Sequence, residues 1–310
     1  MSITTLKDTI KAIAQSLQLS TIIPALIFVL LNVLVVFPSI WPDVEWKLSN
    51  DTVVMGIIFF TVTLSYILYA FNTPLIRLAE GYIGRERYFM TTLEAHQKER
   101  YRHLLECAQP YKKAYDQQKA RQELDMYFPS KEDYVLPMSL GNTIAAFEHY
   151  PSTRYGMDAV ALWPRLIPVL QKNKYIEFVA QQKAVFDFLL NMMYAVLVCG
   201  IELILLYSLS NRLGYAALGI FVTFVLVSLL YLGAVNGARM WGLSVRVAFD
   251  LYRHDLWNLL HLKPVSKYRE EVERWREISR LVKDREEADF FDAFSYEQEE
   301  SATNQNPGEA

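Results

Sequence analysis

The most unusual chemical group in this sequence is the carboxylate of Glu202, which lies inside the apolar stretch from Ala184 to Leu209. A carboxylate well inside a membrane costs at least ~2.5 kcal/mol unless it is paired, protonated or in contact with water. Asn191 precedes Glu202 by eleven residues. At ~3.6 residues per helical turn, the two side chains fall on nearly the same helix face and could line one polar path.

A second polar stripe lies in the apolar stretch from Val53 to Phe71 and just beyond it. Its members are spaced three or four residues apart, as on one helix face: Thr61, Ser65, Tyr69 and Asn72. Together with Asn191 and Glu202, they suggest the wall of a pore or a seam between subunits. The alternative is that they only join helices, through hydrogen bonds worth ~0.6 kcal/mol each. Glu202 could also lie near the outer headgroups if its span is shifted.

A possible ligand site is indicated by the segment from Leu136 to Leu170, which glycine and proline divide into two or three short predicted helices. Polar residues near such turns can hold a ligand, or they can fix helix packing through ion pairs between Arg154 or Arg165 and Glu148 or Asp158. Basic residues among tyrosines, further upstream, could bind phosphates or form a solvated helix face. The candidate ligand-binding residues are Lys112, Lys113, Arg154, Tyr155, Asp158 and Arg165.

Signals for other chemistry are weak. The five histidines form no metal spacing with Cys, Asp or Glu, and the sequence has no phosphate-binding glycine loop and no nucleophile elbow. Cys107 and Cys199, the only two cysteines, suggest neither a disulfide framework nor a metal cluster. We therefore expect no enzyme activity, no cofactor and no metal.

The elements that must position these residues are predicted to be membrane-spanning helices. The chain has 310 residues, of which 52% are hydrophobic and 21% charged, and its net charge is only −3. Its apolar residues gather into four long stretches, each able to cross ~30 Å of hydrocarbon. The predicted spans are Thr21–Phe37, Val53–Phe71, Ala184–Leu209 and Leu213–Val235. No period-two alternation indicates a strand, so we expect an all-α integral membrane protein.

Short links between successive spans predict two hairpins. Lys and Arg are concentrated away from the hairpin tips, which hold only Lys47 and Arg212, so both termini and the central segment are expected in the cytosol. The predicted organisation is an interfacial amphipathic helix (1–20), a first transmembrane hairpin (21–76), a helical cytoplasmic domain (77–183), a second transmembrane hairpin (184–238), cytoplasmic C-terminal helices (239–294) and a disordered tail (295–310). From Arg77 to about Gln109 we expect one helix that continues the second span.

One part of the chain has a family resemblance. The series Gly141-Asn142, Arg154-Tyr155-Gly156 and Trp163-Pro164-Arg165-Leu166 resembles a cytoplasmic segment of uncharacterised bacterial four-span membrane proteins. The resemblance covers about a tenth of the chain and implies a bacterial origin without an activity. For a multi-pass bacterial protein we expect the inner (plasma) membrane. The layout of two spans, a cytosolic domain and two spans is also similar to that of bestrophin-like channels and flagellar stator subunits, whose motifs are missing. Some membrane effectors of anti-phage defence share this broad plan.

These patterns favour a homo-oligomeric channel or pore-forming effector, gated through its cytoplasmic helices. The activating partner would be a nucleotide, a nucleic acid or a protein from the cytosol. The alternative is a non-conducting membrane anchor or scaffold that recruits a cytosolic partner through its C-terminal amphipathic helices, where Val272, Trp275, Ile278 and Val282 are spaced for packing.

Overall fold

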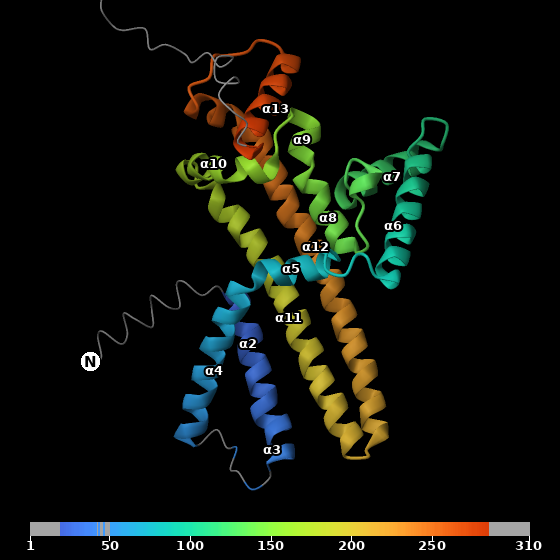
Figure 1. The fold of residues 1–310 in the computed structure, drawn as a ribbon, viewed down its shortest axis with the longest axis vertical. Helices are drawn as coiled ribbons and strands as arrows, with labels where there is room; N and C mark the ends of the chain where they lie inside the picture. Colours follow the sequence, from blue (N-terminus) through green and yellow to red (C-terminus); the bar gives the residue numbers. More distant parts are fainter. Residues whose placement is uncertain (1–18, 42, 44–45, 47–49, 285–310) are drawn as a thin grey trace, which may run out of the picture. The chain divides into compact units, whose positions relative to one another are not determined.

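The computed structural model describes residues 19–41, 43, 46 and 50–284, and every regular element in these ranges is a helix. Four helices are long and apolar enough to cross a membrane, which confirms the predicted all-α class with four candidate spans (Figure 1). The first is a continuous run from Leu19 to Ile40, made of α2 (Leu19–Leu31), the π-helix η1 (Asn32–Val36) and α3 (Phe37–Ile40). The others are α4 (Asp51–Ala70), α11 (Tyr175–Leu209) and α12 (Leu213–Leu259).

Helices α2 and α4 pack side by side (Figure 1). Asn50 caps the start of α4, because its side-chain oxygen accepts a 3.0 Å hydrogen bond from the amide of Thr52. Apolar side chains of both helices, including Val29, Val33 and Ile57, are buried between them. Phe37, Trp41 and Trp46 form an aromatic cluster between the end of the first span and the start of α4, as expected of residues at a membrane interface.

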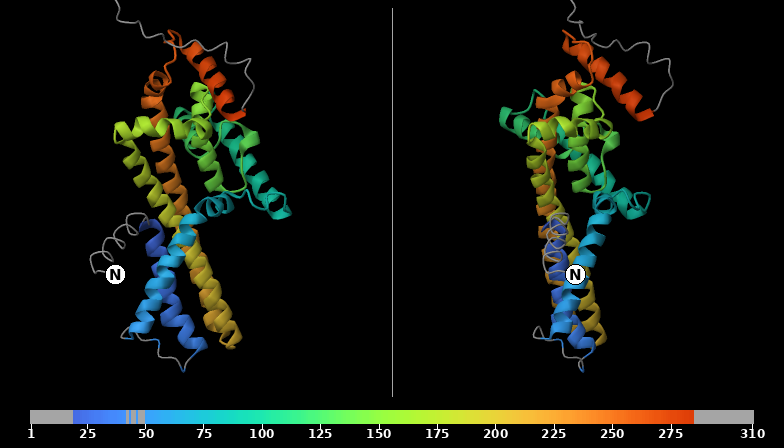
Figure 2. Two further views of the ribbon diagram at one scale, coloured as in Figure 1. Left: turned by 60° about the vertical axis from the view of Figure 1, so that its left-hand side comes forward. Right: turned by 90° about the vertical axis from the view of Figure 1, so that its left-hand side faces the viewer.

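Helices α11 and α12 lie along one another, and small residues permit their close approach (Figure 2). A Cβ atom on Gly200 of α11 would lie 2.3 Å from the hydroxyl of Thr223 on α12, and one on Gly237 of α12 would lie 3.2 Å from the Cα atom of Phe186. Helix α12 has 47 residues. At ~1.5 Å per residue it is ~70 Å long, more than twice the ~30 Å of hydrocarbon that a span must cross.

Between α4 and α11 the chain forms a series of helices of at most 20 residues each. They are α5 (Asn72–Glu80), α6 (Tyr88–Cys107), α7 (Ala114–Tyr127), the 3₁₀ turn η2 (Glu132–Tyr134), α8 (Ser139–Glu148), α9 (Tyr150–Tyr155) and α10 (Ala159–Lys172). The prediction of one helix from Arg77 to about Gln109 is wrong. Gly81 and Gly84 adopt φ values of +86° and +80°, in the left-handed region that ends a helix, and helical structure resumes only at Tyr88. Two or three short helices were predicted between Leu136 and Leu170, and the structure has three there, α8, α9 and α10.

The chain divides into two compact units. Unit 1 comprises Met1–Phe147 and Glu177–Ser244, and unit 2 comprises Glu148–Ile176 and Val245–Ala310. This division follows packing, whereas the six predicted segments follow position relative to a membrane. The predicted interfacial helix falls on residues 1–18, and the end of the C-terminal helix and the tail fall on residues 285–310, so these expectations lie outside the described residues.

Unit 2 is built around the end of α12 and α13 (Tyr268–Asp284). Aromatic side chains of α12 pack within this unit: Phe249 packs on Trp163 of α10, with ring centroids 6.0 Å apart, and Tyr252 packs on Tyr175 at 5.4 Å. Trp275 of α13 is fully buried and meets Trp257 edge to face at 5.2 Å. The predicted packing role of Trp275 is therefore confirmed.

Candidate functional sites

Glu202 of α11 is joined to the first span by a single hydrogen bond. The side-chain amide of Asn32 donates to Glu202 Oε2 at 3.1 Å and also to the carbonyl of Phe28 at 3.1 Å. Among the described residues, no Lys, Arg or His forms an ion pair with Glu202. Asn32 is the first residue of η1, and short π-helical stretches inside helices are frequent at functional sites.

Asn191 lies on the same side of α11 as Glu202, because both side chains meet the first span. Its amide nitrogen donates a 3.1 Å hydrogen bond to the carbonyl of Ser20, at the start of α2. The side chain is completely buried, and its amide oxygen has no hydrogen-bond partner among the described residues. Such an unpaired buried acceptor is costly unless water or an ion satisfies it.

The predicted stripe of the second span separates into buried and exposed members. Thr61 and Ser65 are buried, and the hydroxyl of Ser65 donates to the carbonyl of Thr61 at 2.7 Å. The hydroxyl of Thr61 has no partner among the described residues. Tyr69 is 56% exposed, and Asn72 is half-buried at the junction of α4 and α5. The four residues therefore do not share one environment within a single chain.

Asn72 belongs to a polar junction that includes two residues absent from the predicted site. Its amide donates to Asp187 Oδ1 at 3.3 Å, and the ammonium of Lys183 lies 2.9 and 2.6 Å from the two Asp187 oxygens. Asp187 is only 4% exposed. The spacing of four between Lys183 and Asp187 on one helix was the available sequence signal. A further bond, from the hydroxyl of Tyr194 to the carbonyl of Leu75 at 2.8 Å, also holds α5 against α11.

In unit 2, Tyr155 and a second tyrosine converge on the carboxylate of Asp250. The hydroxyl of Tyr155 donates to Oδ1 at 2.6 Å, and that of Tyr150 donates to Oδ1 at 3.0 Å and to Oδ2 at 3.2 Å. The guanidinium groups of Arg246 and Arg253 lie 4.9 and 4.4 Å from the ring centroids of Tyr150 and Tyr155, respectively. Burial and the Asp250 carboxylate raise the pKa of both tyrosines, so both remain hydrogen-bond donors at neutral pH.

The other candidate ligand-binding residues of unit 2 make internal contacts. Asp158 caps α10 by accepting from the amide of Ala161 at 3.0 Å, and it pairs with Lys283 of α13 at 3.1 Å. Burial opposes its ionisation, but these two interactions outweigh burial and lower the pKa of Asp158. Arg165 donates to the carbonyl of Ala161 at 2.9 Å, and the carbonyl of Arg154 accepts from the hydroxyl of Tyr268.

Lys112 and Lys113 belong to unit 1, whereas the four other predicted ligand-binding residues belong to unit 2. Lys112 pairs with Glu106 at 3.3 Å and lies over the ring of Tyr111, 5.6 Å from its centroid. Lys113 is the residue before α7. None of the six residues lines the cavity described in either unit.

Two residues of the family-like series serve packing. The side chain of Asn142 forms a pair of bonds with the backbone of Leu136, accepting at 2.6 Å and donating at 2.9 Å. A Cβ atom on Gly141 would lie 2.4 Å from the carbonyl oxygen of Glu80, so α8 approaches the end of α5 closely only because this residue is glycine.

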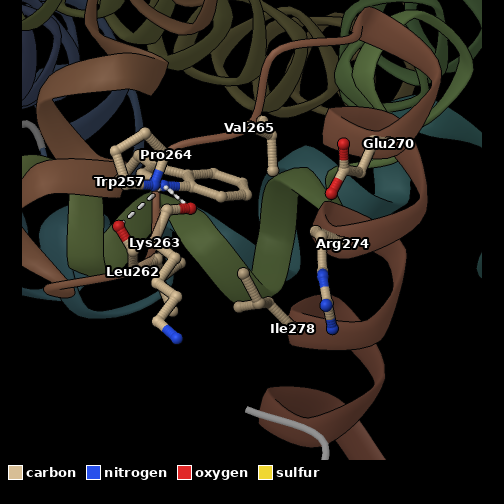
Figure 3. A pocket seen from close by; sticks show the side chains of 8 residues that line it. All are labelled: Trp257, Leu262, Lys263, Pro264, Val265, Glu270, Arg274 and Ile278. Atoms are coloured by element: carbon tan, nitrogen blue, oxygen red, sulfur yellow. Dashed lines mark hydrogen bonds between the residues drawn. The ribbon is translucent and has the colours of Figure 1, made fainter. Parts of the chain in front are cut away.

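Each unit contains a cavity. The one in unit 2, of about 190 Å³, lies between the end of α12, the following loop and α13. Figure 3 shows the indole of Trp257 along one side, donating to the carbonyls of Leu262 at 3.1 Å and Lys263 at 3.2 Å. Glu270 and Arg274 of α13 lie across the cavity from it. The cavity in unit 1, of about 260 Å³, lies among α6, α7, α8 and α12.

The fold defines an all-helical protein with four helices suited to cross a membrane and with polar side chains buried among them. Comparison with protein-family models, with curated proteins and with solved structures finds no match. Within the described residues, no three His, Cys, Asp or Glu side chains are grouped as metal ligands.

Proposed function

We propose that this protein is an oligomeric channel of a bacterial inner membrane, gated through its helices outside the membrane. The observation that carries the proposal is Glu202, a carboxylate inside a span whose hydrogen-bond partner is the amide of Asn32. A purely structural carboxylate at this depth would be expected to have a basic partner. The unpaired oxygens of Asn191 and Thr61 add acceptors that water or a permeating ion would satisfy.

The proposed topology has two transmembrane hairpins, with both termini and the helical domain of residues 77–183 in the cytosol. The distribution of Lys and Arg supports it, because both hairpin tips carry few of them. Cys107 and Cys199 are free, with Cys107 outside the spans and Cys199 buried within α11. A membrane-impermeant maleimide should therefore label Cys107 only in inverted vesicles. Labelling from the outside of intact cells would contradict this orientation.

The proposed gate is the junction of α4 and α5. Asn72, Asp187 and Tyr194 fix this junction to the third span, and α5 leads directly toward the helices α6 to α8. A nucleotide, a nucleic acid or a protein partner that shifts those helices would pull on α5 and hence on α4. The same proposal holds that such a ligand is the signal that opens the channel in anti-phage defence.

The direct test is ion flux from liposomes that contain the purified protein. We expect wild-type protein to release a trapped cation, and Glu202→Gln to change the rate or the cation preference. Thr61→Val, which removes a buried hydroxyl, should also reduce flux. Thr63→Val is the matched control, because Thr63 is exposed on the same helix.

Vesicles that stay tight with wild-type protein under every condition, including added nucleotides and RNA, would overturn the channel proposal. They would favour the alternative, a non-conducting anchor. That alternative makes its own prediction, since deleting residues 268–294 should then remove co-purified cytosolic partners.

A further inference from the structure

The cavity of unit 1 combines aromatic, polar and basic groups from four helices. Its walls come from α6, the end of α7 with the following residue, the start of α8 and the middle of α12: Gln97, Arg100, Tyr127, Phe128, Ser139, Tyr231, Leu232, Val235 and Asn236. A volume of about 260 Å³ can hold a small polar headgroup. Apolar side chains make up much of the lining, and amide, hydroxyl and guanidinium donors lie among them, which suits an amphipathic molecule that carries an anionic group.

The position of this cavity along α12 places it at the edge of the hydrocarbon. The turn before α12 carries Arg212, and the next charged residue is Arg239. Because a span needs ~20 residues, hydrocarbon that begins at Leu213 ends near Leu232, between the two arginines. Tyr231 to Asn236 therefore lie at the level where phospholipid headgroups meet the acyl chains. Leu232 is 63% exposed and would face the acyl region.

Arg239 does not itself line the cavity, but it contacts two residues that do, and no described carboxylate pairs with it. Its guanidinium donates to the side-chain oxygen of Asn236 at 2.7 Å and lies over the ring of Tyr127, 5.9 Å from the centroid. Both of these partners line the cavity. The Nε atom of Arg239 is buried and has no acceptor among the described residues. A half-buried guanidinium with an unsatisfied N–H is a place where an anionic oxygen binds favourably.

Arg100 also lines the cavity, and it lies on α6. It pairs with Glu123 and lies over the ring of Phe128, 5.6 Å from the centroid. Its fork of five N–H groups can bind Glu123 and a further anion together. Arg100 thus places a guanidinium group in the wall of the cavity, on a different helix from Arg239.

We propose that this cavity binds the phosphate headgroup of an anionic phospholipid, with Arg239 and Arg100 as the principal donors. The acyl chains would run along the exposed face of α12 beside Leu232. Such a lipid would join α12 to the helices α6 to α8 at the membrane surface. This site is separate from Glu202, so it stands whether or not the protein conducts ions.

The test uses the full-length protein, purified and delipidated in a neutral detergent. Phosphatidylglycerol should raise the melting temperature in a saturable manner, whereas phosphatidylcholine should not. In the double variant Arg100→Gln/Arg239→Gln, the apparent affinity for phosphatidylglycerol should fall at least ~10-fold, as expected when two charge-assisted contacts are lost. Arg102→Gln is the matched control, because Arg102 lies on α6, pairs with Glu132 and does not line the cavity.

Three results would overturn the proposal. An equal rise with phosphatidylcholine would mean that lipid acts only through its acyl chains. An equal rise with inorganic phosphate or ATP would identify a soluble phosphate ligand instead of a lipid. An unchanged affinity in the double variant would exclude the two arginines as donors.

A second measurement avoids any dependence on the folding of the variants. Wild-type protein is irradiated with phosphatidylglycerol that carries a photoreactive group in its headgroup. The cross-linked peptides should contain residues 231–239 of α12. They should also contain either residues 97–100 of α6 or residues 127–128, at the end of α7 and just after it. Cross-links spread evenly over the four spans would contradict a defined site.

Discussion

The side-chain amide of Asn32 donates a 3.1 Å hydrogen bond to the carboxylate of Glu202, and these residues lie on the first and third candidate spans. They are 170 positions apart in the chain. The bond forms where the first span changes from α-helix to π-helix. Asn32 therefore lies at the start of a rare helix type and binds a carboxylate inside another candidate span.

Asn32→Ala should destabilise the spans, because it leaves the carboxylate of Glu202 without its amide donor. Intramembrane hydrogen bonds average ~0.6 kcal/mol and reach ~1.7 kcal/mol, and we expect a loss in the upper part of this range. In a Glu202→Ala background the same substitution should cost less, since the partner is already gone. Unfolding in mixed detergent micelles measures this coupling, with Thr63→Ala as a control at an exposed position. Equal losses in both backgrounds would show that the bond contributes nothing.

Tyr155→Phe should destabilise unit 2, because Tyr155 is 8% exposed and donates a 2.6 Å bond to the charged Asp250. Hydrogen bonds to charged groups contribute roughly 1.5–3 kcal/mol, so a loss of this size is expected. Faster proteolysis between Tyr268 and Asp284 would report it. Tyr115→Phe is the control, because Tyr115 is 76% exposed on α7 and should leave the digestion rate unchanged.

Gly156→Ala should lower the stability of unit 2 considerably, although it adds only one methyl group. Gly156 ends α9 with φ +77°, and a Cβ atom there would lie 2.4 Å from the carbonyl oxygen of Val272. The left-handed conformation alone costs an alanine ~1–2 kcal/mol, and the overlap with α13 adds to this. Gly214→Ala, in α12 with open space around it, should be neutral or stabilising. Thermal melts of the two variants make the comparison, and similar melting temperatures would argue against this packing of α9 on α13.

Stability should depend on pH through Glu94 of α6. Arg85 binds both of its oxygens, at 2.7 and 2.9 Å, and Lys98 lies at 2.8 Å. The hydrogen bonds from Arg85, followed by those from Lys98, lower the pKa of Glu94 to about 2 despite partial burial. An unfolded glutamate has a pKa of ~4.3, so the stabilisation is complete well above that value and is lost as the pH falls toward 2.

The check for this dependence is the melting temperature of wild-type protein and of Glu94→Gln between pH 7 and pH 2.5. Wild type should melt higher at pH 7, and the difference should shrink below about pH 4, because only the unsubstituted side chain loses charge. Glu99→Gln serves as the control, since Glu99 is exposed on the same helix. A constant difference across the whole range would mean that the ion pairs of Glu94 add no stability.

The four candidate spans and the all-helical class followed from the sequence, because long apolar stretches with few charged residues have few alternatives in water or in a membrane. The short helices from Ser139 to Lys172 also followed, since Pro151 marks the start of α9 and Gly156 marks its end. The break at Gly81 was missed because an isolated glycine is tolerated in many helices. Only the observed φ of +86° shows that this one ends α5.

What the sequence determined by itself was thus the class of element and the unusual residues: Glu202, the stripe from Thr61 to Asn72, and the turns around Arg154 and Arg165. Their partners were decided by tertiary structure alone. Asn32, Asp250 and Lys283 are far in sequence from the groups they bind, and helical periodicity gives only the face of a residue, not the helix that packs against it. For the same reason, the bond between Asn72 and Asp187 and the cavity near Arg239 became visible only when separate helices were brought together.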